Sequence, residues 1–155
     1  MILVYQDEVH FQIQTTVTSG WYKKGSAPTV KSFPGRFKTS YSGFVIPESV
    51  ILFTAKPEMF NYSTTIDSIR SFIDKHPAPV GKKYALVMDN APWHKKTMRL
   101  VEQEALPEYE NIRNSVVFVK LPPYSPDLNP IEQVWRIRRI PIMSSSLHNP
   151  YWKKQ

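Results

Sequence analysis

Short apolar runs in the first third of the chain predict β-strands. Residues 2–6 are predicted to form a buried strand that ends at Asp7 and Glu8. Apolar and polar residues then alternate over 11–17, which is the pattern of a half-buried strand. Two more strands, over 41–46 and 50–54, are predicted on either side of a turn at 47–49.

The pattern then changes to the spacing of a helix. Ile66, Ile69 and Ile73 recur three or four residues apart. Thr64 is a candidate N-cap, and Pro77 is expected to end this helix.

Strands and helices alternate along the rest of the chain. Residues 84–88 are apolar without interruption, as expected of a strand covered on both faces. Pro92 suits the first position of a helix, whose predicted inner face holds His94, Met98, Val101 and Ala105. Residues 116–119 are predicted to form another buried strand.

The last predicted helix follows a proline-rich loop over 121–130. Asn129 suits its N-cap, Pro130 its first position, and Pro141 is expected to end it. Its inner face is predicted to hold Ile131, Val134 and Trp135. This order of elements predicts one α/β domain, a mixed sheet with helices packed on it, over 1–140. An irregular basic tail is expected over 141–155.

Size and composition agree with one domain that buries a core, because 41% of the 155 residues are apolar. No apolar run approaches the roughly 18 residues that span a bilayer. The first residues lack the basic leader and cleavage site of a signal peptide. We therefore expect a cytoplasmic protein with no membrane partner. The absence of cysteine excludes disulfides, thiolate metal sites and cysteine nucleophiles.

Positive charge is segregated along the chain. Residues 9–47 and the residues after Glu132 contain no acidic residue. Together these two regions have a charge of +10, and the remainder has a charge of −3, which gives the net charge of +7. Clustered cations favour a polyanion because each neutralised phosphate releases counterions. The candidate DNA-binding residues are Lys23, Lys24, Lys31, Arg36, Lys38, Arg136, Arg138 and Arg139. On charge alone, a solvated basic surface remains the alternative.

Three carboxylates fall where an α/β sheet collects its functional groups. Asp7 follows the first predicted strand, Asp89 follows the most apolar strand, and Glu132 lies in the first turn of the last helix. Sites in such sheets form beyond the carboxyl ends of the strands. Converging carboxylates repel one another unless a cation lies between them, and oxygen ligands favour Mg²⁺ or Mn²⁺. Two such ions roughly 4 Å apart can clamp a phosphodiester.

Each of these residues also has a purely structural interpretation. A carboxylate at a strand end can be a solvated loop charge, and Glu132 can complete a capping box with Asn129. Asn90 can cap the helix that follows it, and His94 can be an ordinary half-buried histidine. The residues by themselves leave these alternatives open.

Three segments together form a far more specific pattern: YQDEVHF at 5–11, VMDNAPWH at 87–94 and LPPYSPDLNPIEQVW at 121–135. In this order they closely resemble the DDE domain of the mariner superfamily of transposases, in its prokaryotic insertion-sequence branch. The resemblance extends over about residues 2–138. It implies a ribonuclease-H-like fold, metal-dependent hydrolysis at transposon ends and attack of the freed 3′ hydroxyl on target DNA.

Matched position by position, the resemblance implies that Asp7, Asp89 and Glu132 are the catalytic acids. These acids would hold Mg²⁺ or Mn²⁺, as two ions. Asn90, His94 and Asn129 match positions near them and are expected to be supporting residues.

Two departures from the family pattern concern the ends of the sequence. Family members usually have an N-terminal helix-turn-helix region, whereas this sequence begins at the first catalytic strand. We therefore expect a separate reading frame, an internal start or a truncated copy. We also expect a second transposase chain or a separate helix-turn-helix chain as partner. After Arg138 the sequence PIMSSS replaces the family's basic helix, which predicts a frameshifted or decayed end.

Two other functions compete with a catalytic transposase domain. One is an inactive remnant that binds nucleic acid or a partner chain through its basic regions. The other is a metal phosphohydrolase for small molecules, which would share the carboxylates but leaves the basic regions and the third segment without a role. Intact Asp7, Asp89 and Glu132 favour the enzyme.

Overall fold

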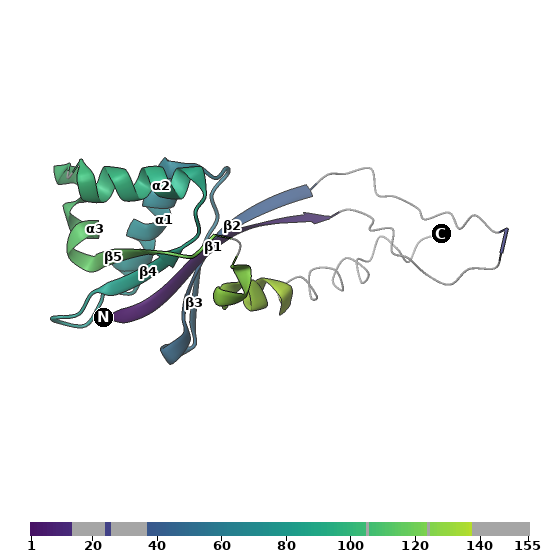
Figure 1. The fold of residues 1–155 in the computed structure, drawn as a ribbon, viewed down its shortest axis with the longest axis horizontal. Helices are drawn as coiled ribbons and strands as arrows, with labels where there is room; N and C mark the ends of the chain where they lie inside the picture. Colours follow the sequence, from purple (N-terminus) through teal and green to yellow (C-terminus); the bar gives the residue numbers. More distant parts are fainter. Residues whose placement is uncertain (14–23, 26–36, 105, 124, 138–155) are drawn as a thin grey trace.

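The computed structural model describes residues 1–13, 24–25, 37–104, 106–123 and 125–137. In these residues five strands form one sheet in the order β3-β2-β1-β4-β5 (Figure 1). The strands are β1 (Ile2–Ile13), β2 (Phe37–Ile46), β3 (Ile51–Ala55), β4 (Tyr84–Met88) and β5 (Val116–Lys120). Strands β1 to β3 pair antiparallel, and β4 and β5 run parallel to β1. The predicted mixed sheet is confirmed.

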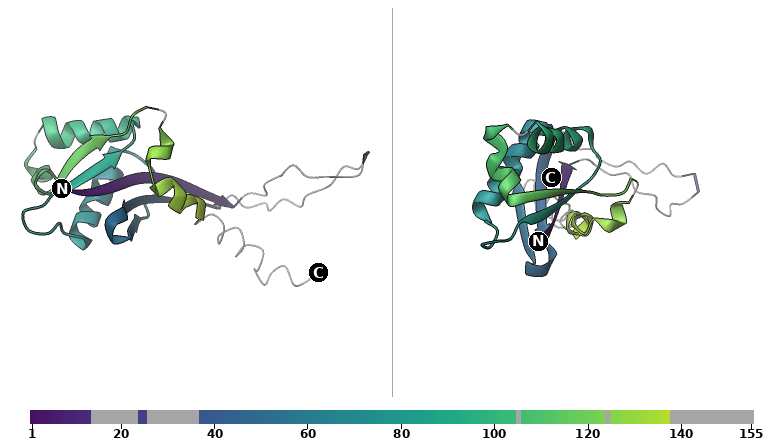
Figure 2. Two further views of the ribbon diagram at one scale, coloured as in Figure 1. Left: turned by 60° about the horizontal axis from the view of Figure 1, so that its bottom comes forward. Right: turned by 60° about the vertical axis from the view of Figure 1, so that its left-hand side comes forward.

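Helices cover both faces of this sheet (Figure 2). On one side lie α1 (Tyr62–Lys75), α2 (Pro92–Met98) with a π-helical turn (Arg99–Gln103), and α3 (Glu110–Ser115) after a 3-10 turn (Pro107–Tyr109). Their core with the sheet includes Phe44 stacked on Phe72, with ring centroids 4.8 Å apart. The helix over 131–137 lies on the other face, where Ile131 and Trp135 pack against Val9 and Val45. Shorter 3-10 turns occupy Pro47–Ser49 and Pro126–Leu128.

The first strand does not end where the sequence predicts. β1 continues without a break from Ile2 to Ile13, so Asp7 lies inside the strand rather than after it. Pairing with β2 extends from Tyr5 to Ile13. The backbone hydrogen bonds of this pairing keep the polar residues Asp7 and Glu8 in the strand. Residues 11–13 of the strand predicted over 11–17 are therefore the last three residues of β1. The rest of that predicted strand, with Ala105, Pro141 and the tail over 141–155, lies outside the described residues.

Two other predictions are corrected. Thr64 is not the N-cap of α1: Asn61 is, because its side chain accepts from the Thr64 amide at 3.0 Å while the Thr64 hydroxyl accepts from the Asn61 amide. β5 is an edge strand rather than a buried one, and Val117 and Val119 are 38% and 40% exposed. The short α3 was not predicted. No helix in the described ranges is both long and apolar enough to traverse a bilayer.

Candidate active site

The register of the sheet places Asp7 and Asp89 beside one another. β1 and β4 pair in parallel from Ile2 with Tyr84 to Tyr5 with Val87. Asp7 and Asp89 each lie two residues beyond the last of these pairs. β4 ends there, while β1 continues along β2. The two carboxylates therefore meet where the parallel pairing stops, as expected of a site at the carboxyl end of a strand.

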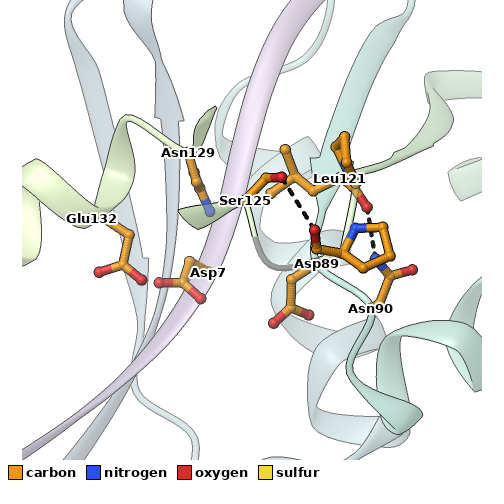
Figure 3. A pocket seen from close by; sticks show the side chains of 9 residues that line it. Asp7, Asp89, Asn90, Leu121, Ser125, Asn129 and Glu132 are labelled. Atoms are coloured by element: carbon orange, nitrogen blue, oxygen red, sulfur yellow. Dashed lines mark hydrogen bonds between the residues drawn. The ribbon is translucent and has the colours of Figure 1, made fainter. Parts of the chain in front are cut away.

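A cleft of about 380 Å³ opens at this point. In Figure 3 the carboxylates of Asp7 and Glu132 face each other, and Asp89 lies on the other side of Asp7. The residues that line the cleft are Asp7, Asp89, Asn90, Leu121, Pro122, Pro123, Ser125, Asn129 and Glu132. Five of the six predicted catalytic and supporting residues thus share one cleft, and His94 is buried behind Asp89.

Burial of the helix over 131–137 presents Glu132 to this cleft. Ile131 is fully buried and Trp135 is 3% exposed, which fixes one face of the helix on the sheet. The Trp135 indole Nε1 donates to Asp7 Oδ2 at 3.0 Å. Gly43 on β2 is paired directly with Asp7, and a Cβ at this glycine would overlap the Trp135 ring. The glycine therefore makes the space through which the helix reaches Asp7.

Asp7 is electrostatically strained by its surroundings. Burial, and to a smaller extent the negative charges of Glu132 and Asp89, together raise the pKa of its carboxyl to about 7. Hydrogen bonds from the Glu8 backbone amide and from Trp135 act in the opposite direction. A nearby cation would remove this repulsion.

Asp89 is held by hydrogen bonds on one of its oxygens. Its Oδ1 accepts from the Ala91 amide at 2.9 Å and from His94 Nδ1 at 2.5 Å. The bond from His94 is the main reason that the pKa of Asp89 lies below its usual value. Burial alone would lower the pKa of His94, but its bonds to Asp89 and Glu8 and their charges raise it to about 9. These two contacts therefore favour the protonated form of the ring.

Asn90 and Asn129 do not act as the helix caps that their positions suggest. Asn90 Nδ2 donates to the Leu121 carbonyl at 2.6 Å (Figure 3), which ties the end of β4 to the loop after β5. α2 has no side-chain N-cap. Asn129 Oδ1 is buried without a hydrogen-bond partner. The hydrogen bonds of the described residues include no capping box between Asn129 and Glu132, so that alternative for Glu132 is wrong.

Sequence reasoning overlooked Glu8. Its side chain is 6% exposed and contacts His94 Nε2 at 3.2 Å. The signal that could have found it is the alternation of side chains along a strand. If β1 continues past Asp7, the side chain of Glu8 must face the opposite side of the sheet from Asp7, toward α1 and α2. The premature end predicted for β1 concealed this.

The predicted DNA-binding residues are only partly described. Lys24, Lys38 and Arg136 are exposed, on a turn, on β2 and on the helix over 131–137. The remaining candidates, Lys23, Lys31, Arg36, Arg138 and Arg139, lie outside the described residues. A DNA-binding surface therefore stays a prediction.

The donor set of the cleft suits a divalent cation. Asp7, Asp89 and Glu132 offer only oxygen donors, which Mg²⁺ and Mn²⁺ prefer. Burial is the main cause of the raised pKa of Asp7, and the repulsion from Glu132 and Asp89 that adds to it is of the kind a cation offsets. Within the described ranges, no group of three or more His, Cys, Asp or Glu side chains is arranged to hold a metal ion. Metal binding by these three residues therefore stays a prediction.

Comparisons with known proteins agree with this architecture. The family model described as DDE superfamily endonuclease matches residues 2–146. A chain of the simian T-cell lymphotropic virus intasome, in complex with the PP2A regulatory subunit B56 gamma, aligns with 96% of this chain at a TM-score of 0.59 and 16% identity. The Mos1 transposase paired-end complex with left transposon end aligns with 83% at a TM-score of 0.51 and 23% identity. The Mos1 mariner paired-end complex with Mn aligns with 83% at 0.50 and 22%.

These alignments confirm the ribonuclease-H-like fold. They cover 42% of the intasome chain and 38% of each Mos1 chain, so this chain spans about two fifths of the length of the proteins that it matches. A comparison with curated protein sequences finds no match.

Proposed function

Because the chain belongs to the DDE superfamily endonucleases, we propose that it is the catalytic domain of a transposase, which cleaves DNA strands at transposon ends and transfers them to target DNA. One observation carries this proposal. Asp7 and Asp89, from neighbouring parallel strands, line one cleft with Glu132 from a helix 125 residues further along the chain than Asp7.

The three carboxylates are proposed to hold Mg²⁺ or Mn²⁺, as two ions. Bound divalent ions would activate the attacking oxygen and stabilise the leaving oxygen of a phosphodiester. The protein's own contribution is to fix the carboxylates in place. Trp135 orients Asp7, and His94 orients Asp89. Asn90 holds the loop at Leu121, which forms part of the cleft wall.

DNA is the proposed partner, bound through the basic residues on either side of the acidic part of the sequence. We propose that a second transposase chain or a separate helix-turn-helix chain recognises the transposon end. The proposed setting is the cytoplasm of a prokaryote, on an insertion sequence. Residues 1–140 are proposed to form the catalytic domain, with 141–155 as a basic tail.

The test is DNA nicking by this chain and by its Asp89→Asn variant. A labelled element-end duplex is incubated with Mg²⁺ or Mn²⁺, and Asp74→Asn, an exposed carboxylate on α1, is the matched control. We expect the wild type and the control to nick the duplex. Asp89→Asn should fold and bind DNA but not nick it, because it loses the charge that holds the metal.

Equal nicking by the wild type and Asp89→Asn would remove the catalytic assignment. A wild-type chain that is folded and binds DNA, but stays inactive even when an end-recognition domain is supplied, would favour the inactive remnant.

A further inference from the structure

A buried carboxylate with several hydrogen-bond donors around it lies behind the cleft and has no place in the proposed chemistry. It belongs to Glu8, which does not line the cleft. Burying an ionised carboxylate costs free energy unless charges and hydrogen bonds offset the loss of water. The contacts of Glu8 therefore need a reason beyond filling the core.

Glu8 is surrounded by donors from three elements. Trp93 Nε1 of α2 donates to its Oε2 at 2.7 Å, and Gln6 Nε2 of β1 donates to its Oε1 at 3.3 Å. His94 Nε2 lies 3.2 Å from Oε1, and the Thr65 hydroxyl of α1 lies 3.3 Å from the same oxygen. The carboxylate is thereby fixed between β1, α1 and α2.

His94 connects this buried acid to the cleft. The ring is 1% exposed, so it has almost no access to water. Nδ1 contacts Asp89 Oδ1 at 2.5 Å, while Nε2 contacts Glu8. Each ring nitrogen thus lies within hydrogen-bonding distance of a carboxylate oxygen, one on Asp89 and one on Glu8. Glu8 thus fixes the ring plane, and the ring plane fixes one oxygen of Asp89.

Asp89 needs such support because of where it lies. It is the first residue after β4, and its side chain is 52% exposed. Both of its hydrogen bonds among the described residues go to Oδ1, from His94 and from the Ala91 amide. Without the histidine, only the backbone bond would restrain the carboxylate.

We propose that Glu8 and His94 are positioning residues that hold Asp89 in the orientation needed to bind a divalent metal, with Glu8 acting only through His94. This inference rests on the proposed function and deepens it. Neither residue is among those that line the cleft, so neither is assigned to metal, substrate or proton transfer. The arrangement is a carboxylate–histidine–carboxylate chain in which the inner acid sets the geometry of the outer one.

The experiment compares Mn²⁺ binding by the whole chain and by variants, measured by isothermal titration calorimetry without DNA. The variants are Glu8→Gln, His94→Gln and the double variant, with Glu102→Gln, an exposed residue beyond α2, as matched control. Glutamine keeps the size of Glu8 but replaces one carboxylate oxygen with an NH₂ group, which cannot accept a hydrogen bond from Trp93 or His94. We expect Glu8→Gln and His94→Gln each to weaken Mn²⁺ binding by about 10- to 100-fold, and the control to bind as the wild type does.

The double variant tests the connection itself. If Glu8 acts through His94, Mn²⁺ binding by the double variant should equal that of His94→Gln alone. Losses that multiply would overturn the action through His94. Wild-type affinity in Glu8→Gln would overturn the positioning role altogether.

Two further measurements keep the outcomes separable. If circular dichroism shows that Glu8→Gln is unfolded, Trp93→Phe replaces it as the test, because this variant removes one hydrogen-bond donor to Glu8. A measurable loss of Mn²⁺ affinity in Trp93→Phe supports the proposal, and wild-type Mn²⁺ affinity overturns it. Nicking by the wild type but not by Asp89→Asn, with Glu8→Gln unchanged in nicking and affinity, would reject the inference and keep the proposed function. A wild type that neither binds Mn²⁺ nor nicks DNA rejects both.

Discussion

Asp7 carries an ionisation cost that a single substitution should reveal. Its pKa is raised from 3.8 in the absence of interactions to about 7 in the folded chain, first by burial and then by the charges of Glu132 and Asp89. A carboxyl with a raised folded pKa favours the folded state only while it is protonated. This contribution is complete below about pH 4 and is lost as the pH rises through about 7. Asp7→Asn should remove that dependence.

The size of the effect follows from the shift. Each pKa unit corresponds to about 1.4 kcal/mol, so the shift of Asp7 corresponds to an upper limit of about 4 kcal/mol. Asparagine can still accept the hydrogen bond from Trp135 and carries no charge at any pH. We therefore expect Asp7→Asn to be more stable than the wild type by up to about 4 kcal/mol near pH 8 without metal. Near pH 4 the two should be almost equally stable.

The assay is urea-induced unfolding of both proteins at several pH values, with a chelator present. Other groups also titrate over this range, so the quantity compared is the difference in unfolding free energy between variant and wild type. Asp74→Asn, an exposed carboxylate on α1, serves as control and should give a difference that changes little with pH. Adding Mn²⁺ near pH 8 should stabilise the wild type more than Asp7→Asn, because a cation relieves the same repulsion.

Two results would refute this reasoning. Asp7→Asn could be no more stable than the wild type near pH 8, which would mean that the cleft does not strain the carboxylate. Alternatively, the gain could be the same near pH 4 and pH 8, which would assign it to packing instead of charge. Asp89→Asn should behave oppositely and lose stability at neutral pH, because it removes the partner of His94.

Three other predictions concern the cleft and its surface. Gly43→Ala should destabilise the chain by about 1–3 kcal/mol in thermal unfolding and reduce nicking, because the new methyl group displaces the Trp135 ring. Trp135→Phe should cost about 1–3 kcal/mol, measured in the same way, through the lost hydrogen bond to Asp7; unchanged stability would show that this bond has no net value. DNA binding should be largely independent of sequence and fall steeply with salt, and Lys38→Ala and Arg136→Ala should each reduce the salt slope by about 1 in filter binding. A preference for element ends that persists at high salt would contradict this.

Much of the fold could be predicted from the sequence because the signals for these elements are local. The apolar run 84–88 became β4 with both predicted boundaries, since five consecutive apolar residues can be accommodated only between two covered faces. Pro92 opens α2 as predicted, because its fixed φ suits the first turn. Ile131 and Trp135 face inward as their spacing requires.

The boundaries that failed depended on pairing partners rather than on local preference. β1 continues through Asp7 and Glu8 because β2 lies beside it and completes its hydrogen bonds. β5 is exposed along one side because it lies at the edge of the sheet, which no property of its four valine and phenylalanine residues encodes. The N-cap of α1 is the exception, because the reciprocal bonds that make Asn61 the cap join it to Thr64, only three residues away.

The sequence by itself determined which residue types are present for chemistry, and in what order. It placed Asp89 at the end of a strand and Glu132 at the start of a helix, and its three segments identified the family. Only the tertiary structure decided which of these residues meet. The parallel register of β1 and β4 brings Asp7 beside Asp89, and the gap at Gly43 lets Trp135 reach Asp7. The side of the sheet that Glu8 faces depends on β1 remaining a strand, and this is a consequence of long-range hydrogen bonds that single residues do not specify.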